Sequence, residues 1–334
     1  MEALQALMAG IVDYAGLFPP ARLAMQPVVA NYAKYRAGPQ RAMLGRVICP
    51  TQRFDEFADC AGAALATGAD GPWLVSALGR GGDDAANFLE GVAADVAALR
   101  ALTERFEGRV QVDAYECRLP HAVVERCKPE GLAELAGAVA QRVDADAPGL
   151  LTPYYEVPFV AFAGDWRRDV PPAIAGLAQH NRSQARGGRC QPGAVKIRTG
   201  GVEAGAFPSV EQVTAFIRWC ADERIAFKAT AGLHHPVRHY AALVQTKMHG
   251  FLNVFGAAVL TWAHDLDAAT IACIVEDEEA KHFRCDAGGF HWQERFTATV
   301  EEIGAARRAF AHGFGSCSFD EPVEDLRALG MLRG

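Results

Sequence analysis

The sequence predicts an α/β protein built as a (β/α)8 TIM-type barrel with a C-terminal extension. Short apolar or β-branched segments alternate with helical segments, and the alternation recurs roughly every thirty to forty residues, as in βαβ units. No glycine-rich dinucleotide-binding motif follows an early strand, so an open Rossmann-type sheet is disfavoured. The chain has 334 residues, half of them hydrophobic, which is enough for one large barrel.

The strands and helices follow one another in regular order. The first strand candidate is the short segment 11–17, and the expected helices show apolar residues at helical spacing, as at Phe54, Phe57, Ala61 and Leu65. Seven clearer strands are expected at 44–49, 73–78, 110–117, 151–159, 194–198, 225–231 and 251–257. Helices are expected between them at 54–68, 84–106, 129–143, 172–188 and 209–223.

The C-terminal part is less regular. We expect the barrel to occupy residues 1–264 and the extension, packed on the barrel, to occupy 265–334. The extension is expected to contain a helix at 268–279, a late strand or hairpin at 281–292, a helix at 294–311, a loop at 313–322 and a short final helix. If the N-terminal candidate is wrong, the segment 283–290 becomes the alternative eighth strand.

The charge and hydropathy of the sequence indicate which classes of binding partner to expect. A formal charge of −7 without a basic cluster gives no footprint for nucleic acid or an anionic membrane. The N-terminus lacks the features of a signal peptide, and no apolar run reaches the roughly 18 residues of a membrane span. We therefore expect a cytoplasmic protein with a small-molecule substrate, and the sequence leaves a homo-oligomer open.

The nine cysteines do not form a recognisable pattern. They are scattered without CxxC spacing, which indicates reduced thiols rather than a disulfide framework or a zinc site. Cys317, in "GSCSF", is the one candidate nucleophile among them. It would need a nearby base.

Two expected strands carry a lysine at their centre and end in glycine: "AVKIRTGG", with Lys196, and "AFKATAGLHH", with Lys228. An ammonium is costly to bury unless it is paired or neutralised. If the two lysines are neighbours, each cation lowers the other's pKa, and one becomes an amine that attacks a carbonyl to form a Schiff base. Asp113 or Glu116 would then transfer protons.

Further polar residues lie near the expected strand ends, where barrel active sites form. As substrate-binding candidates the sequence offers Arg198, Thr199, Gly200, Gly201, Glu156, His234, His235 and Asn253. Each also has a structural interpretation: Arg198 could neutralise Glu156, and Asn253 could satisfy a buried backbone group. Adjacent histidines on a strand point to opposite faces, so only one of His234 and His235 is expected to meet a given ligand.

The stretch 194–260 resembles the deoxyribose-phosphate aldolases. In that family a strand bearing Lys and then Thr-Gly is followed by a helix and a strand reading Lys-Ala-x-Gly-Gly, and "NVFGAAVL" at 253–260 is similar to its eighth strand. The resemblance implies a class I aldolase barrel in which Lys196 forms the Schiff base and Lys228 tunes it. Here Ala231 stands where the family has its first glycine, which weakens the implied phosphate site.

Two other functions use the same residues. His234, His235, Glu116 and Glu156 could bind a divalent metal in a barrel lyase or isomerase, whereas the imine route needs no cofactor. The barrel could also be a non-catalytic binder of small anions through Lys196, Arg198 and Lys228. The sequence places the imine-forming lyase first, acting on a small oxygenated carbonyl compound.

Overall fold

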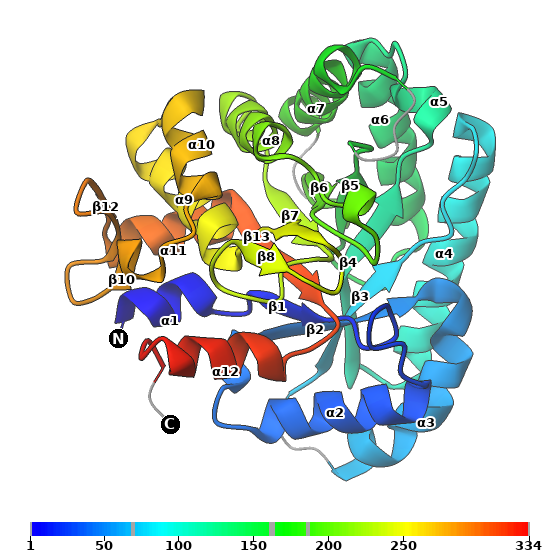
Figure 1. Cartoon of the computed structure of the whole chain (residues 1–334). Helices are drawn as coiled ribbons and strands as arrows, with labels where there is room; N and C mark the ends of the chain where they lie inside the picture. Colours follow the sequence, from blue (N-terminus) through cyan, green and yellow to red (C-terminus); the bar gives the residue numbers. More distant parts are fainter. Residues whose placement is uncertain (1, 68–70, 160–163, 185–187, 333–334) are drawn as a thin grey trace.

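Eight parallel strands close a barrel at the centre of the molecule, which confirms the predicted (β/α)8 fold (Figure 1). The computed structural model describes residues 2–67, 71–159, 164–184 and 188–332. Around the barrel the strand order is β1-β13-β7-β6-β5-β4-β3-β2. These strands are β1 (Val12–Tyr14), β2 (Leu44–Pro50), β3 (Trp73–Leu78), β4 (Val110–Arg118), β5 (Thr152–Glu156), β6 (Ala194–Arg198), β7 (Phe227–Thr230) and β13 (Ala311–Ser316).

The helices surround the strands (Figure 1). They are α1 (Glu2–Met8), α2 (Met25–Ala37), α3 (Phe54–Thr67), α4 (Ala85–Arg105), α5 (His121–Val124), α6 (Pro129–Asp146), α7 (Trp166–Ser183), α8 (Val210–Asp222), α9 (Phe251–His264), α10 (Ala268–Glu276), α11 (Val300–Ala309) and α12 (Asp320–Ala328). Helix α8 shows why they form: Ser209 and Gln212 make a capping box at its N-terminus, and Val213, Phe216 and Ile217 lie on its buried face.

The main core lies between the strands and the helices. On β6, Val195 and Ile197 are fully buried in the main core cluster, and Lys196 between them points the other way, into the barrel lumen. Ala114, Tyr154 and Ala194 form a separate small cluster inside the barrel. The alternation of side chains along β6 therefore directs the lysine inward.

The predicted strand 251–257 is wrong, because these residues begin helix α9. Every residue from 251 to 261 is buried, so this stretch of the helix has no exposed face. A helix that is apolar all round cannot be distinguished from a buried strand by periodicity, and its aromatic and β-branched residues favoured the strand.

The eighth strand is β13, which starts at the end of the helix predicted at 294–311 and continues into the segment predicted to be a loop at 313–322. It pairs with β1 on one side and β7 on the other, so the barrel closes only at residues 311–316 and the predicted boundary at residue 264 is wrong. Its sequence, "AHGFGS", has weak strand propensity. Gly313 is needed there because a Cβ atom would lie 2.6 Å from the Ile11 carbonyl oxygen.

Two small antiparallel sheets lie between β7 and β13 in the chain. One comprises β8 (His239–Ala241) and β9 (Thr246–Met248), and the other β10 (Phe283–Cys285), β11 (Phe290–Trp292) and β12 (Phe296–Ala298). The hairpin predicted at 281–292 is confirmed as β10 and β11, so the alternative eighth strand at 283–290 is wrong. Residues 68 and 185–187 of two predicted helices lie outside the described residues.

Among the described residues, no helix combines the length and the apolar character that crossing a membrane requires.

Candidate active site

Lys196 and Lys228 are neighbours across the β6–β7 pair, as the sequence predicts. They are register partners in the parallel ladder, and each side chain is only 2% exposed. Glu156 on β5 is in turn the register partner of Lys196. Residues paired in register share a face of the sheet, so these three side chains enter the lumen side by side.

Carboxylates surround both lysines. Lys196 Nζ lies 2.8 Å from Glu116 Oε2 and 2.7 Å from Glu156 Oε2. Lys228 Nζ lies 2.6 Å from Glu116 Oε1 and 2.5 Å from Asp13 Oδ2. Glu116, 1% exposed, therefore bridges the two ammonium groups, and we call these five residues the lysine–carboxylate cluster.

The cluster has further polar neighbours. Ser76 Oγ donates a hydrogen bond of 2.7 Å to Glu116 Oε1. The ammonium of Lys228 also lies over the Tyr154 ring, 5.3 Å from its centroid. Tyr154 Oη in turn lies 2.9 Å from His312 Nδ1. Glu116 is thus held by three donors, which fixes its position between the lysines.

The electrostatics of the lysines differ from the expectation. Burial alone would lower the pKa of Lys196, but the Glu116 and Glu156 carboxylates outweigh it and hold the pKa above its ordinary value. For Lys228, burial would likewise lower the pKa, but the Asp13 and Glu116 carboxylates outweigh this effect, so its pKa is also raised. The expectation that a second cation depresses the pKa of Lys196 is wrong, because carboxylates lie between and around the two ammonium groups.

The pKa values of two carboxylates in the cluster are shifted downwards. Burial would raise the pKa of Glu116, yet Lys196 and Lys228 together hold it well below its ordinary value. For Glu156, burial is likewise outweighed by Lys196 and Arg198, so its pKa is lowered. These pKa shifts favour the ammonium forms of Lys196 and Lys228 and the carboxylate forms of Glu116 and Glu156.

A cavity of about 280 Å³ opens above the cluster at the carboxyl ends of the strands. Lys196, Glu116 and Glu156 contribute to its wall, whereas Lys228 does not. The remaining lining residues are Ala15, Phe18, Pro19, Ile48, Leu78, Arg198, Gly201, Val202, Thr230, Ala231, His234, Gly315 and Cys317. The geometry thus distinguishes the two lysines: Lys196 meets the cavity, and Lys228 supports Glu116 from below.

Asp113, predicted as a proton-transfer group, lies apart from the lysines. It forms a bidentate pair with Arg46, with distances of 2.6 Å to Nε and 2.7 Å to Nη2. It precedes Glu116 by three residues on β4, or about 10 Å along the strand. Asp113 is absent from the lining of the cavity, and it lies where the β3–β4 register shifts between Val112 and Ala114.

The segment after β6 divides between the cavity and the scaffold. Arg198 lines the cavity and pairs with Glu156 at 3.3 Å, and Gly201 also lines it. The Thr199 hydroxyl instead donates to the Ala231 carbonyl at 2.5 Å. A Cβ atom on Gly200 would lie 2.7 Å from Gly232 Cα, so this glycine permits close contact between the loops after β6 and β7.

Of the two adjacent histidines, only His234 lines the cavity. Its Nδ1 lies 2.8 Å from Glu321 on α12, and its Nε2 lies 4.0 Å from Cys317 Sγ. His235 pairs with Asp325 at 2.5 Å. The expectation that only one of the pair meets the same ligand fits this geometry.

Asn253 is structural in its contacts. It sits in α9, fully buried, where its Oδ1 accepts from the Arg238 backbone N–H at 2.8 Å and its Nδ2 donates to two carbonyls at 2.7 Å. It is not part of the cavity lining.

The metal ligand set proposed from the sequence is not assembled. His234 and His235 engage Glu321 and Asp325 rather than Glu116 and Glu156. Within the described part of the chain, no group of three or more His, Cys, Asp or Glu residues is placed to hold a metal ion.

Sequence reasoning missed three members of the site. Asp13 is the central residue of a strand of only three residues, and its turn-rich context, "DYAGLFPP", hid this strand position. Ser76 and Tyr154 have no distinctive motif. The available signal was their position within predicted strands, because alternate residues of a strand point to the same face of the sheet.

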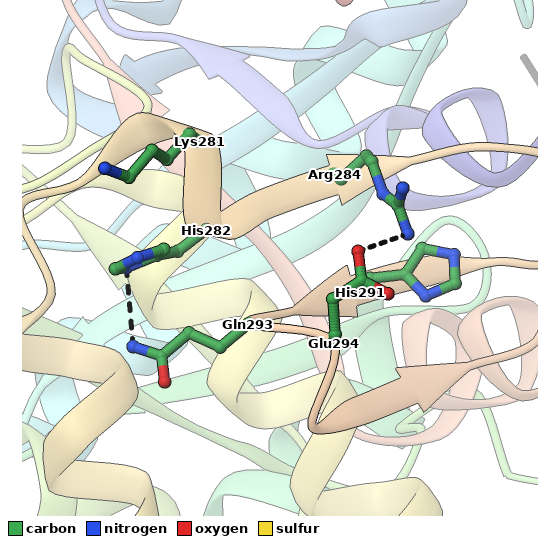
Figure 2. A pocket seen from close by; sticks show the side chains of 6 residues that line it. All are labelled: Lys281, His282, Arg284, His291, Gln293 and Glu294. Carbon is green, nitrogen blue, oxygen red and sulfur yellow. Dashed lines mark hydrogen bonds and ion pairs between the residues drawn. The ribbon is translucent and has the colours of Figure 1, made fainter.

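A second hollow of about 520 Å³ lies beside the β10–β12 sheet (Figure 2). Its polar residues pair with one another: Arg284 lies 2.8 Å from Glu294, and Gln293 lies 3.4 Å from His282. Its lysine, Lys281, is 77% exposed and lies 3.5 Å from Glu279. The smaller cavity over the lysine–carboxylate cluster is the better candidate for chemistry.

No protein-family model matches the chain, and no curated protein matches it.

Proposed function

We propose that the protein is a carbon–carbon lyase of the imine-forming type that acts on a small oxygenated carbonyl compound. The observation that carries the proposal is the position of Lys196, a buried lysine whose side chain is held by two carboxylates at the wall of a cavity. Buried, paired titratable groups in a cavity are typical of catalytic sites.

Charge conservation explains why a carboxylate-paired lysine suits this chemistry. An ammonium and a carbonyl compound combine to give a protonated imine and water, so the site carries one positive charge before and after the reaction. Glu116 and Glu156, which stabilise the ammonium, stabilise the iminium in the same place. The raised pKa of Lys196 therefore reflects a site that favours the cationic intermediate.

Attack itself needs the neutral amine. In the hydrogen bond of 2.8 Å, the Lys196 ammonium can pass a proton to Glu116, which creates the amine at the moment of attack. The protonated carboxyl group then returns the proton to the carbinolamine hydroxyl as water leaves. Lys228 and Ser76 hold Glu116 in place for both transfers.

Cleavage follows from the iminium. It withdraws electrons from the adjacent carbon, and a carboxylate removes the proton of a hydroxyl group one carbon further along. The carbon–carbon bond breaks, an aldehyde leaves, and the enamine that remains is protonated and hydrolysed. Glu156 lines the cavity and is the carboxylate assigned to the hydroxyl proton.

The two alternative functions have less support. The metal ligand set is not assembled in the described residues. For anion binding, the cations Lys196, Lys228 and Arg198 are matched by the carboxylates of Asp13, Glu116 and Glu156, so an incoming anion meets no surplus of positive charge.

Borohydride trapping tests the proposal. The protein is treated with borohydride and a panel of small hydroxyaldehydes, ketones and keto acids, and the adducts are located by intact mass and peptide mapping. We expect one substrate-sized adduct on Lys196 that is lost in Lys196→Met and retained in the surface control Lys281→Ala. Turnover of the trapped compound is then measured by release of the aldehyde.

Two outcomes of the trapping experiment would contradict the proposal. Labelling spread over exposed lysines, or a panel that leaves Lys196 unmodified in folded protein, removes the imine mechanism.

A further inference from the structure

A second nucleophilic group borders the same cavity. Cys317 follows β13, and His234 follows β7, and both contribute to the cavity wall. Cys317 Sγ lies 4.0 Å from His234 Nε2, while Glu321 Oε2 lies 2.8 Å from His234 Nδ1. Nucleophile, base and orienting carboxylate are thus arranged in line, at the looser spacing that is common in the absence of substrate.

Cys317 and Glu321 flank the two ring nitrogens of His234. Burial alone would lower the pKa of His234, but its acidic partners Cys317 and Glu321, one at each ring nitrogen, raise it to about 9. A protonated imidazole at this position carries a proton on Nε2, the ring nitrogen that faces Cys317 Sγ.

The structure assigns Cys317 and His234 to a covalent aldehyde-binding site at the cavity wall. The thiolate sulfur forms a bond to the carbonyl carbon, the carbon–oxygen π bond breaks, and the oxygen takes the Nε2 proton of the His234 imidazolium. The product is a neutral hemithioacetal with a neutral imidazole, and no oxidant or reductant takes part. The reverse steps release the aldehyde unchanged.

Aldehyde addition is the reaction that this pair can complete. It needs one nucleophile and one proton donor, which Cys317 and His234 supply. Acyl transfer would also need donors for an oxyanion and a route for a leaving group. The site does not depend on Lys196 as a nucleophile, so it stands apart from the proposed lyase even though both share one cavity.

Alkylation with iodoacetamide, followed by peptide mapping, tests this site. We expect Cys317 to react at least tenfold faster than the exposed Cys273, and His234→Gln to slow Cys317 about tenfold without changing Cys273. Propanal should protect Cys317, and 1-propanol, which lacks the carbonyl group, should not.

Protection is measured in Lys196→Met as well as in the wild type, because an imine on Lys196 would also obstruct the cavity. Protection that persists in Lys196→Met supports the thiol site whatever the borohydride result, and its loss there overturns the site. A second measurement uses unmodified protein with carbonyl-labelled ¹³C propanal. A tetrahedral-carbon resonance that disappears in Cys317→Ser supports the hemithioacetal, and a spectrum identical in the two proteins overturns it.

Discussion

Glu116 is the residue on which the cluster depends. It is 1% exposed and accepts hydrogen bonds from Lys196, Lys228 and Ser76. A buried ion pair is weak evidence for net stability, but removal of one partner leaves the others buried and uncompensated. Because Glu116 lies between the two lysines, the loss of its carboxylate would leave two buried ammonium ions without a shared partner.

We expect Glu116→Gln to lower the free energy of unfolding by about 3–5 kcal/mol, because two buried ammonium ions lose their shared carboxylate. Urea unfolding at neutral pH measures the change. The control is Glu56→Gln, which breaks the surface pair with Arg53 and should leave the unfolding midpoint unchanged. Equal midpoints for the two variants would show that Glu116 does not hold the lysines.

The loops after β6 and β7 form the next level of organisation. Gly200 and Gly232 lie face to face, and the Thr199 hydroxyl ties the two loops together at the Ala231 carbonyl. These loops carry Gly201 and His234 into the cavity wall. The glycines that suggested a phosphate site therefore also serve close backbone contact.

Gly232→Ala tests this contact. The residue has a φ of +73°, and a Cβ atom would lie 2.7 Å from the Thr199 carbonyl oxygen. Backbone strain and the clash together should cost about 1–3 kcal/mol of stability. Gly62→Ala is the matched control: it lies in α3 with open space around it, and a gain of about 0.5–1 kcal/mol is expected there. Stability changes of the same sign in both variants would contradict the interpretation.

At the scale of the whole molecule, residues from both ends of the chain meet at the cavity. Strand β1 pairs with β13, and α12 supplies Glu321 to His234 and Asp325 to His235. The insertion between β7 and β13 is fixed to the barrel in part through His249, which is fully buried. Its Nε2 lies 2.8 Å from the Pro208 carbonyl oxygen, and its Nδ1 lies 3.2 Å from Arg238.

His249 should make stability depend on pH. Burial lowers its pKa to about 4, from an ordinary 6.5, so the folded protein keeps this imidazole neutral. Between these values the unfolded chain binds the extra proton, and the contribution to stability, present above pH 6.5, is lost as the pH falls to about 4. The loss is about 3 kcal/mol at 1.36 kcal/mol per pKa unit.

Urea unfolding at intervals from pH 7 to pH 4 measures this dependence. We expect His249→Gln to be less stable at pH 7 and to lose less stability on acidification than the wild type. Parallel curves for the two proteins would rule out His249 as a source of the pH dependence.

The sequence by itself determined the (β/α)8 barrel, most of its strands and the pairing of Lys196 with Lys228. It could do so because each strand, and the order of strands and helices along the chain, can be recognised from short stretches of sequence. It also marked Glu116, Glu156 and His234 as cavity residues. It failed at the eighth strand: the buried residues 251–257 of α9 were predicted to be a strand, and most of the glycine-containing β13 was predicted to be a loop.

Only the tertiary structure decided which groups meet. Barrel closure brings Asp13 from the first strand to Lys228 on the seventh, and separates Asp113 from both lysines along the lumen. The same closure sets carboxylates around the ammonium groups and so reverses the expected direction of the lysine pKa shifts. These outcomes depend on contacts between residues far apart in the chain, and electrostatic interactions are fixed by distance in space rather than by separation in sequence.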